Sequence, residues 1–219
     1  MKIRYLGIEH YSITFEKMKK FTSSRNQNSE DELWLLEHHP IYTQGQNGNP
    51  KNILNVNNNI PIFQSDRGGQ ITYHGPGQLI GYILIDLKRK KMGIKKLIDS
   101  IHISLINLLT NYSIPASTKN NNPGVFIKNK KIASIGLRIK NNCTYHGFSL
   151  NVSMNLNPFK NINPCGFKQL EMTQISNYIP NISMNTIINA FISNFTNQIK
   201  IYENNTSIKS YNYTKNMDL

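Results

Sequence analysis

The sequence predicts an α+β fold, in which helices and mostly antiparallel strands follow one another in mixed order. The segment Ile94–Leu109 carries its apolar residues at the spacing of one helical face. The segments Gly124–Lys128 and Lys131–Lys140 flank the polar pair Asn129-Lys130, which suits the tight turn of an antiparallel hairpin. Because strand and helix patterns do not alternate regularly, a parallel α/β sheet is not expected.

The first half of the chain is predicted to form one helix and three strands. Glu9–Phe21 can form an amphipathic helix, which ends in the polar segment Thr22–Asp31. The strands are short apolar runs: a buried strand at Glu32–Glu37, an edge strand at Ile60–Phe63 and a buried strand at Leu79–Leu87. His38-His39-Pro40 and the polar loop Thr43–Asn59 lie between the first strand and the second. Pro61 is acceptable in the second of these because an edge strand leaves N–H groups unpaired.

The second half contains the Ile94–Leu109 helix, the hairpin, one more strand and a final helix. The apolar face of the first helix consists of Ile94, Leu97, Ile98, Ile101, Leu105, Leu108 and Leu109. Tyr145–Val152 has enough polar and apolar alternation for a strand. Ser183 is a predicted N-cap for the last helix, whose apolar face consists of Ile187, Ile188, Phe191, Ile192 and Phe195.

Length and composition favour one soluble domain. A chain of 219 residues can bury a sizeable core, and no linker divides it. Its longest apolar runs are too short to span a bilayer, and the N-terminal stretch lacks the apolar centre of a secretory signal. We therefore expect a cytoplasmic protein that does not bind membranes.

The formal net charge of +13 raises the alternative of a basic RNA-binding module. The lysines are scattered over every segment, together with an excess of Asn and Ile, rather than gathered on one face. The clustered aromatic residues of an RNA-recognition motif are also not visible in the sequence. Nucleic acid is therefore not the expected partner, and salt-sensitive RNA binding without any enzymatic activity would reverse this interpretation.

A glycine-rich stretch, Asp66–Leu79 (DRGGQITYHGPGQL), is the first candidate for a functional site. It lacks the glycine spacing of a dinucleotide-binding turn and the Gly-Lys-Ser/Thr end of a P-loop. It offers exposed backbone at Gly68 and Gly69 and a guanidinium at Arg67. Polar side chains follow on Gln70, Thr72 and His74, and the last two share one face if Ile71–His74 is extended. The stretch is either a wide turn between strands or a cradle for an elongated ligand that is part polar and part apolar.

Cys165 is the second candidate, because it lies in the bend Asn163–Phe167 (NPCGF), where no regular strand or helix is expected. A bend can project a thiol into a cleft, whereas a cysteine that only fills a core usually lies inside an apolar run. Cys143, in a polar segment, is the weaker candidate for a reactive thiol. A thiol near its ordinary pKa is only partly ionised at neutral pH and needs a basic neighbour for catalysis. The chain has many lysines, and the residues alone do not indicate which one would serve.

Several motifs resemble, in order and spacing, those of the octanoyltransferases of protein lipoylation. The motifs are EHHPIYTQGQ at Glu37–Gln46, RGGQITYHGPGQ at Arg67–Gln78, PGVFIKNKKIASIGLRI at Pro123–Ile139, YHGFSLNV at Tyr145–Val152 and INPCG at Ile162–Gly166. The resemblance implies the mixed sheet with packed helices of the biotin/lipoate protein ligase superfamily, which is similar to class II aminoacyl-tRNA synthetases. It covers roughly residues 30 to 175, and the first 30 residues and the polar tail from Asn204 are expected to hold no site residues.

The resemblance implies that Cys165 and Lys131 are the catalytic residues, with Lys130 left for the hairpin turn. Cys165 would attack an octanoyl thioester, and the acyl group would pass from a cysteine thioester to a lysine ε-amine. The implied substrate-binding residues are Arg67, Gly68, Gly69, Gln70, Ile71, Thr72, Tyr73, His74, Ser134, Ile135, Gly136, Gly147, Phe148 and Ser149. His38, His74 and His146 are also expected near the site, His38 more as a structural residue. Backbone N–H groups around Gly77 or Gly136 are candidate oxyanion donors.

The same resemblance implies octanoyl-acyl carrier protein as the donor. The implied acceptors are the lipoyl domains of 2-oxoacid dehydrogenase complexes and the glycine cleavage H protein. Neither a cofactor nor a metal is expected, because the thioester is already activated and the histidines lack a metal-ligand spacing. A monomer is expected. The alternative on the same fold is an ATP-dependent lipoate or biotin protein ligase, which would use a lysine without a catalytic cysteine; stimulation of acyl transfer by ATP with free octanoate would favour it.

Overall fold

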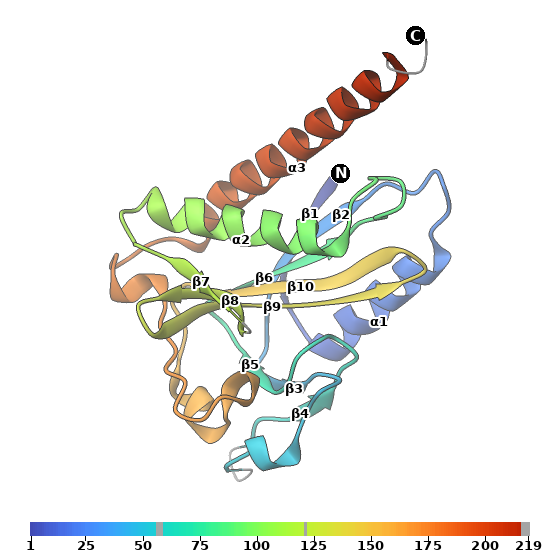
Figure 1. Cartoon of the computed structure of the whole chain (residues 1–219). Coiled ribbons are helices and arrows are strands. Elements are labelled where there is room, and N and C mark those ends of the chain that lie inside the picture. The colour runs from blue at the N-terminus through green and yellow to red at the C-terminus, as the bar shows by residue number, and fades with distance from the viewer. Residues whose placement is uncertain (56–58, 121, 216–219) are drawn as a thin grey trace.

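Two β-sheets and three α-helices make up the computed structural model, which describes residues 1–55, 59–120 and 122–215, without the side chains of 204–215 (Figure 1). The larger sheet has seven strands, and β1 pairs in parallel with β2 while its other pairings are antiparallel. In order across the sheet they are β1 (Lys2–Glu9), β2 (Glu32–His38), β6 (Gln78–Leu84), β10 (Cys143–Asn151), β9 (Lys130–Lys140), β8 (Asn122–Ile127) and β7 (Ser117–Lys119). The predicted α+β class with a mixed sheet is confirmed.

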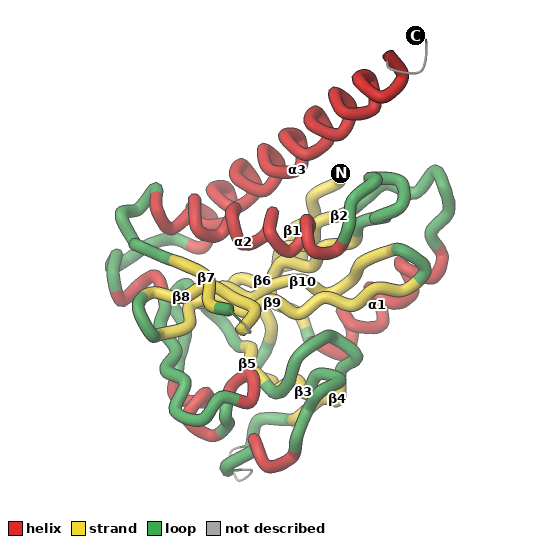
Figure 2. The backbone as a smooth tube through the Cα atoms, in the orientation of Figure 1, coloured by secondary structure: helices red, strands yellow, loops and turns green. Residues whose placement is uncertain are grey.

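A smaller sheet of three strands lies below the larger one in Figure 1. Its order is β4 (Ile62–Gln64), β3 (Ile41–Gln44) and β5 (Thr72–His74), so β4 is an edge strand, as predicted for this region. The long connection after β10 forms only short 3₁₀ turns, at Asn157–Asn161, Pro164–Gly166 and Ile175–Asn177, and it runs beside the small sheet (Figure 2).

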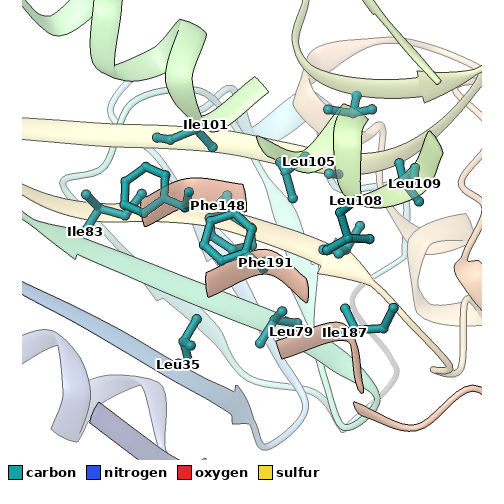
Figure 3. Packing of buried hydrophobic residues seen from close by; sticks show 14 of the residues in the cluster. Leu35, Leu79, Ile83, Ile101, Leu105, Leu108, Leu109, Phe148, Ile187 and Phe191 are labelled. Atoms are coloured by element: carbon teal, nitrogen blue, oxygen red, sulfur yellow. The ribbon is translucent and has the colours of Figure 1, made fainter. Parts of the chain in front are cut away.

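The helices cover both faces of the larger sheet. α1 (Tyr11–Ser24) lies on one face, and α2 (Ile94–Thr110) packs with α3 (Met184–Lys215) on the other. Figure 3 shows how Phe148 of β10 meets Phe191 of α3, with ring centroids 4.3 Å apart, among leucines of α2. Apart from Ile98, which lines a cavity described below, the apolar faces predicted for the two long helices therefore lie in the main core.

The predicted boundaries differ from the observed ones at the N-terminus. Lys2–Glu9 forms the edge strand β1, and Glu9 pairs with His38, so the helix predicted from Glu9 begins at Tyr11 and continues to Ser24. This strand exposes large apolar side chains, 59% of Tyr5 and 50% of Ile8, and so has no clear inward-facing pattern. Its pairing with β2, rather than a local pattern, determines its conformation.

Two polar segments also contain more strand than the sequence predicted. The start of the predicted loop Thr43–Asn59 belongs to β3, and residues 56–58 of that loop lie outside the described residues. In the hairpin, Lys130 pairs with Ile127, so the turn is Lys128-Asn129 rather than Asn129-Lys130. Lys128 adopts the left-handed conformation, with φ of 55°, which a two-residue hairpin turn requires.

Candidate active site

Cys165 and Lys131 lie next to each other although 34 residues separate them in the chain. The Lys131 Nζ donates a hydrogen bond to the Cys165 Sγ over 3.2 Å. Lys131 is completely buried, whereas Cys165 is partly exposed. The pair therefore places a thiol that a substrate can reach beside an amine that bulk water cannot reach.

The Cys165 thiol is held by an unusual turn. Pro164–Gly166 forms a 3₁₀ turn in which Cys165 has φ 57° and ψ 18°, the left-handed conformation that non-glycine residues rarely adopt. The Cys165 N–H donates to the Ile71 carbonyl over 3.0 Å, which attaches the turn to the start of β5. Strain of this kind is concentrated at functional sites, where the surrounding structure determines the backbone conformation.

Lys131 is aimed at the thiol by an irregularity in β9. Val125 of β8 pairs with Ala133, but Phe126 pairs with Lys131, so Ile132 is an extra residue in β9. Such a bulge changes the direction of the neighbouring side chains. Ile132 enters the main core, while Lys131 turns to the Cys165 turn. The backbone of Lys131 bonds to the segment after the cysteine, because its N–H donates to the Glu171 carbonyl and its carbonyl accepts from the Thr173 N–H.

The Lys131 side chain also contacts the Phe126 ring, whose centroid lies 5.5 Å from Nζ, and Asn122, which the sequence did not indicate. The Lys131 Nζ donates to the Asn122 Oδ1 over 2.7 Å, and Asn122 is itself buried. Gly124 leaves the room that the lysine needs, because a Cβ there would lie 2.5 Å from the Lys131 Cε and 2.2 Å from the Ala133 carbonyl oxygen. The amine thus has an acceptor on one side and the thiol on the other.

Replacing Asn122 by alanine is expected to slow the acyl transfer that the sequence resemblance implies by roughly 5- to 150-fold, because a buried donor left without its partner costs about 1–3 kcal/mol. The amine would keep its place but lose the group that fixes its orientation. Single-turnover rates with an octanoyl thioester measure the effect. The exposed Asn120 gives the matched control, since Asn120→Ala removes the same amide from the neighbouring surface. An unchanged rate for Asn122→Ala would show that the bond does not orient the amine.

A cavity of about 610 Å³ opens beside the thiol, and we call it the site cavity. It is lined by most of the residues that the sequence predicted for the substrate: Arg67, Gly68, Gly69, Gln70, Thr72, His74, Ser134, Ile135, Gly136, Gly147, Phe148 and Ser149, together with Cys165 and Lys131. Ile71 and Tyr73 do not line it. They alternate with Thr72 and His74 along the extended segment and pack on the opposite side, in a cluster with Phe159 and Ile162.

Arg67 shapes the glycine-rich loop from inside the protein. Its guanidinium is buried and bonds to the carbonyls of Thr43, Gly68 and Gln70 and to the Thr43 hydroxyl, at 2.6–3.1 Å. No carboxylate is among its partners in the part of the chain that the structure describes. Burial lowers the pKa of Arg67 from its ordinary value. Arg67 therefore fixes the carbonyls of the loop and also places positive charge close to Cys165.

Histidine and tyrosine rings form the inner end of the site cavity, where Tyr11, His74, Tyr82 and His146 line it. The Tyr11 ring lies 6.1 Å from that of His74, and Tyr82 lies 6.1 Å from His146. His146 bonds through Nε2 to the Asp66 carboxylate over 2.8 Å, while its buried Nδ1 has no partner among the described residues. This end of the cavity is thus aromatic but carries several polar atoms.

The same ring cluster holds its histidines neutral. Burial lowers the pKa of His146 and lowers that of His74 well below its ordinary value. Burial also lowers the pKa of His38 to about 4. His38 does not line the cavity; its Nδ1 donates to the Glu9 carbonyl, and its Nε2 accepts from the Tyr82 hydroxyl over 2.6 Å. These bonds agree with the structural role expected for His38.

The free energy of unfolding is expected to fall as the pH is lowered from 7.5 to 5. The unfolded chain binds protons on these histidines near pH 6.5, whereas folded His38 resists protonation down to about pH 4, so the unfolded state gains protons first. The stability that depends on neutral His38 is therefore fully present above pH 6.5 and is lost between pH 6.5 and 4. At pH 5 the loss from His38 alone is ~2 kcal/mol of the free energy of unfolding.

Urea unfolding at several pH values measures this loss. His38→Gln is expected to lower stability at pH 7.5 but to decline less towards pH 5. The exposed neighbour His39 gives the control, and His39→Gln should follow the wild-type curve. A wild-type curve that stays flat between pH 7.5 and 5 would contradict the buried neutral state of the three histidines.

Some site features differ from what the sequence predicted. Tyr11 lines the site cavity, so the expectation that the first 30 residues hold no site residue is corrected; the apolar pattern of α1 gave no sign of it. The side chains of the tail from Asn204, for which the same was expected, lie outside the described residues. Gly77, a candidate oxyanion donor, does not line the cavity, and its N–H donates to the Glu37 carboxylate over 2.6 Å. Gly136, the other candidate, does line it.

Among the side chains that the structure describes, in residues 1–55, 59–120 and 122–203, no group of three or more His, Cys, Asp or Glu is placed to hold a metal ion. Among those residues, no helix combines the length and the apolar character that crossing a membrane requires.

Comparison with known sequences identifies close relatives. The family model described as the lipoyl protein ligase A/B catalytic domain matches residues 10–196. An octanoyltransferase of Legionella pneumophila (strain Lens) is 54% identical over 91% of this chain and 100% of its own length. Those of Buchnera aphidicola subsp. Acyrthosiphon pisum and Vibrio cholerae serotype O1 are 50% and 43% identical, over 91% and 96% of this chain and 94% and 97% of their own lengths.

Comparison with solved structures finds the same fold at low sequence identity. A bipartite lipoate protein ligase of Thermoplasma acidophilum, solved as part of an archaeal lipoylation system, superposes with a TM-score of 0.74 at 15% identity, over 91% of this chain and 83% of that one. Lipoate-protein ligase A bound with ATP gives 0.72 at 14% identity, over 91% and 85%. Biotin protein ligase of Aquifex aeolicus in complex with biotin and ATP gives 0.61 at 14% identity, over 93% and 72%. At such identity the likeness shows the fold alone.

Proposed function

This chain belongs to the lipoyl protein ligase A/B catalytic-domain family and, within it, to the octanoyltransferases, and we propose that Cys165 and Lys131 carry out its octanoyl transfer. The proposed donor is octanoyl-acyl carrier protein, and the proposed acceptor is a lysine of a lipoyl domain. The single observation that supports these roles best is the 3.2 Å hydrogen bond between the Lys131 Nζ and the Cys165 Sγ at the wall of the site cavity.

In the first step, the thiol proton of Cys165 passes to the Lys131 amine, and the thiolate attacks the carbonyl carbon of the octanoyl thioester. The bond from that carbon to the sulfur of the carrier arm breaks, and Lys131 returns the proton to the departing thiolate. An octanoyl thioester on Cys165 and a free carrier thiol result. The Asn122 amide keeps the Lys131 Nζ in position during this exchange.

In the second step, the ε-amine of the acceptor lysine attacks the Cys165 thioester. Lys131 takes a proton from that amine and gives it to the Cys165 sulfur as the thioester breaks, and an amide remains on the acceptor. Two large protein substrates can visit in turn because the acyl group waits on Cys165 between them, so ping-pong kinetics are expected.

The site cavity supports an acyl chain as the group that is carried. Its walls near Cys165 consist of small residues in Ser134–Gly136 and Gly147–Ser149, with Phe148 between them. Gln70 packs against Gly166 of the cysteine turn, because a Cβ on Gly166 would lie 2.3 Å from the Gln70 Nε2. A chain that lies along the glycine-rich loop would therefore present its thioester at Cys165.

An ATP-dependent ligase remains the alternative with the same fold, since several structural neighbours are lipoate and biotin ligases. The partly exposed thiol beside Lys131 favours the transferase, because a ligase that forms an acyl-adenylate has no use for a nucleophilic cysteine at this place. The octanoyltransferase relatives at 43–54% identity point in the same direction.

Intact mass spectrometry after incubation with octanoyl-acyl carrier protein tests the proposal. The protein should gain the mass of one octanoyl group, lose it on treatment with hydroxylamine, and transfer it to an added lipoyl domain. Acyl transfer that requires ATP and free octanoate, with no adduct from the carrier, would replace the transferase by the ligase.

Further properties follow from the same proposal. We propose that residues 1–219 form a single catalytic domain that acts as a monomer in the cytoplasm. Its acceptors are the lipoyl domains of 2-oxoacid dehydrogenase complexes and the glycine cleavage H protein. One cluster of buried residues from Leu33 to Ile199 joins both halves of the chain, which supports one folding unit. Sedimentation of the protein alone and assays with each acceptor test these points.

A further inference from the structure

A second hollow adjoins the site cavity on the side of α2, and we call it the α2 hollow. Its volume is about 420 Å³, and it is lined by Leu87, Lys88, Lys91, Met92, Gly93, Ile94, Ile139 and Asn142. Ile94 and Ile139 also line the site cavity. The two hollows therefore share these two side chains as their boundary, and we call this boundary the passage.

Two lysines give the α2 hollow a positive charge that the protein itself does not neutralise. Four basic residues follow one another at Lys88–Lys91. Arg89 and Lys90 both pair with the buried Asp31, and Lys90 also pairs with Glu203. Lys88 and Lys91, by contrast, are exposed and form no ion pair with any residue that the structure describes. An anion in the α2 hollow would meet two cations without competing carboxylates.

The passage between the two hollows is apolar at its centre. Ile139 is 39% exposed, so its side chain is accessible at this boundary. Beside it, Arg138 lines the site cavity and donates to Gln46 over 2.6 Å. From the surface inwards, a ligand would thus pass cations first, then isoleucines with a polar rim, and last the thiol of Cys165.

We propose that the α2 hollow binds the phosphate of the phosphopantetheine arm on which the acyl donor presents its thioester. The arm has a phosphate anion at one end, a flexible amide-containing chain in the middle and a thioester at the other end. These parts match, in the same order, the cations of the α2 hollow, the isoleucines of the passage with their polar rim, and the Cys165 thiol. Charge complementarity at Lys88 and Lys91 would hold the arm while the acyl chain enters the site cavity. This inference rests on the proposed function, because it assumes a donor of this kind.

The test compares two small donors that differ only in the phosphate, octanoyl-phosphopantetheine and octanoyl-pantetheine. In the wild type, kcat/KM for acylation of Cys165 should be about tenfold higher for the phosphorylated donor, and the preference should decrease as salt is added. The double variant Lys88→Glu and Lys91→Glu should lose this preference while its rate with octanoyl-pantetheine stays unchanged. Its melting temperature should stay close to that of the wild type, because both side chains are exposed.

The matched control is Lys20→Glu with Lys160→Glu, two exposed lysines that line neither hollow and form no ion pair with any residue that the structure describes, and it changes net charge equally. This control should keep the preference. The inference is overturned if the wild type does not distinguish the donors, or if the preference survives reversal at Lys88 and Lys91. Calorimetric titration with phosphopantetheine that carries no acyl group should show binding to the wild type and none to Lys88→Glu with Lys91→Glu, and equal binding to both would overturn the inference. If no donor acylates Cys165, the proposed function is refuted, and this titration still decides whether the α2 hollow binds the phosphate.

Discussion

Replacing Cys165 by serine is expected to reduce the rate of acylation by octanoyl-acyl carrier protein at least about 1,000-fold, because a serine hydroxyl is a far weaker nucleophile than a thiolate at neutral pH. The fold should be retained, since the Cys165 N–H, and not its side chain, bonds to the Ile71 carbonyl. Intact mass after a timed incubation, with and without hydroxylamine, measures the loss of the adduct.

Cys143 provides the control for this experiment. Cys143 is 6% exposed and does not line the site cavity, and burial raises the pKa of its thiol. Cys143→Ala should therefore acquire one octanoyl group as the wild type does. If Cys165→Ser still forms a hydroxylamine-labile adduct at the wild-type rate, another residue is the nucleophile.

Replacing Lys131 by alanine is expected to lower the acylation rate by about 100- to 10,000-fold, the usual contribution of a positioned acid or base. The thiol would lose its hydrogen-bond donor and its proton acceptor in one change. Binding of the donor should be largely kept, because the cavity walls at Ser134–Gly136 and Gly147–Ser149 remain. Single-turnover kinetics over a range of donor concentrations separate the rate from the binding.

Lys130 is the matched control, because it is the neighbouring residue and its side chain points to the surface, where it pairs with Glu171 over 2.7 Å. Lys130→Ala should keep the wild-type rate. Lys131→Met, which fills the same buried space without an amine, separates loss of chemistry from loss of packing and should be as slow as Lys131→Ala. Wild-type turnover in either Lys131 variant would remove Lys131 from the mechanism.

The elements with strong local patterns could be predicted from the sequence. The α2 face from Ile94 to Leu109 and the α3 face around Phe191 both lie in the main core, as their spacing indicated. The bend at Cys165 and the glycine-rich loop were also recognisable, because prolines and glycines restrict or free the backbone locally. These features depend on a few neighbouring residues and are therefore visible without the fold.

The features that depend on long-range pairing could not be predicted from residue patterns. The choice of Lys131 over Lys130 depends on the bulge at Ile132, which arises from the pairing of β9 with β8. Asn122 reaches the site from β8 and Tyr11 from α1, and neither lies in a pattern that marks a site. Resemblance to the octanoyltransferases supplied Lys131 where the residues alone left every lysine open.

The attachment of the cysteine segment to β9 has a consequence for the exchange of substrates. Cys165 is tied to Ile71 by its own N–H, and the same segment is bonded to both sides of the Lys131 backbone through Glu171 and Thr173. In the proposed mechanism, an acyl group on this thiol would therefore have little freedom to move towards an acceptor, because the backbone of the segment is held at several points. Both protein substrates would have to bring their own flexible groups, a prosthetic arm or a lysine side chain, to one sulfur atom held in place. Most of the distance that the acyl group travels would then be covered by the substrates.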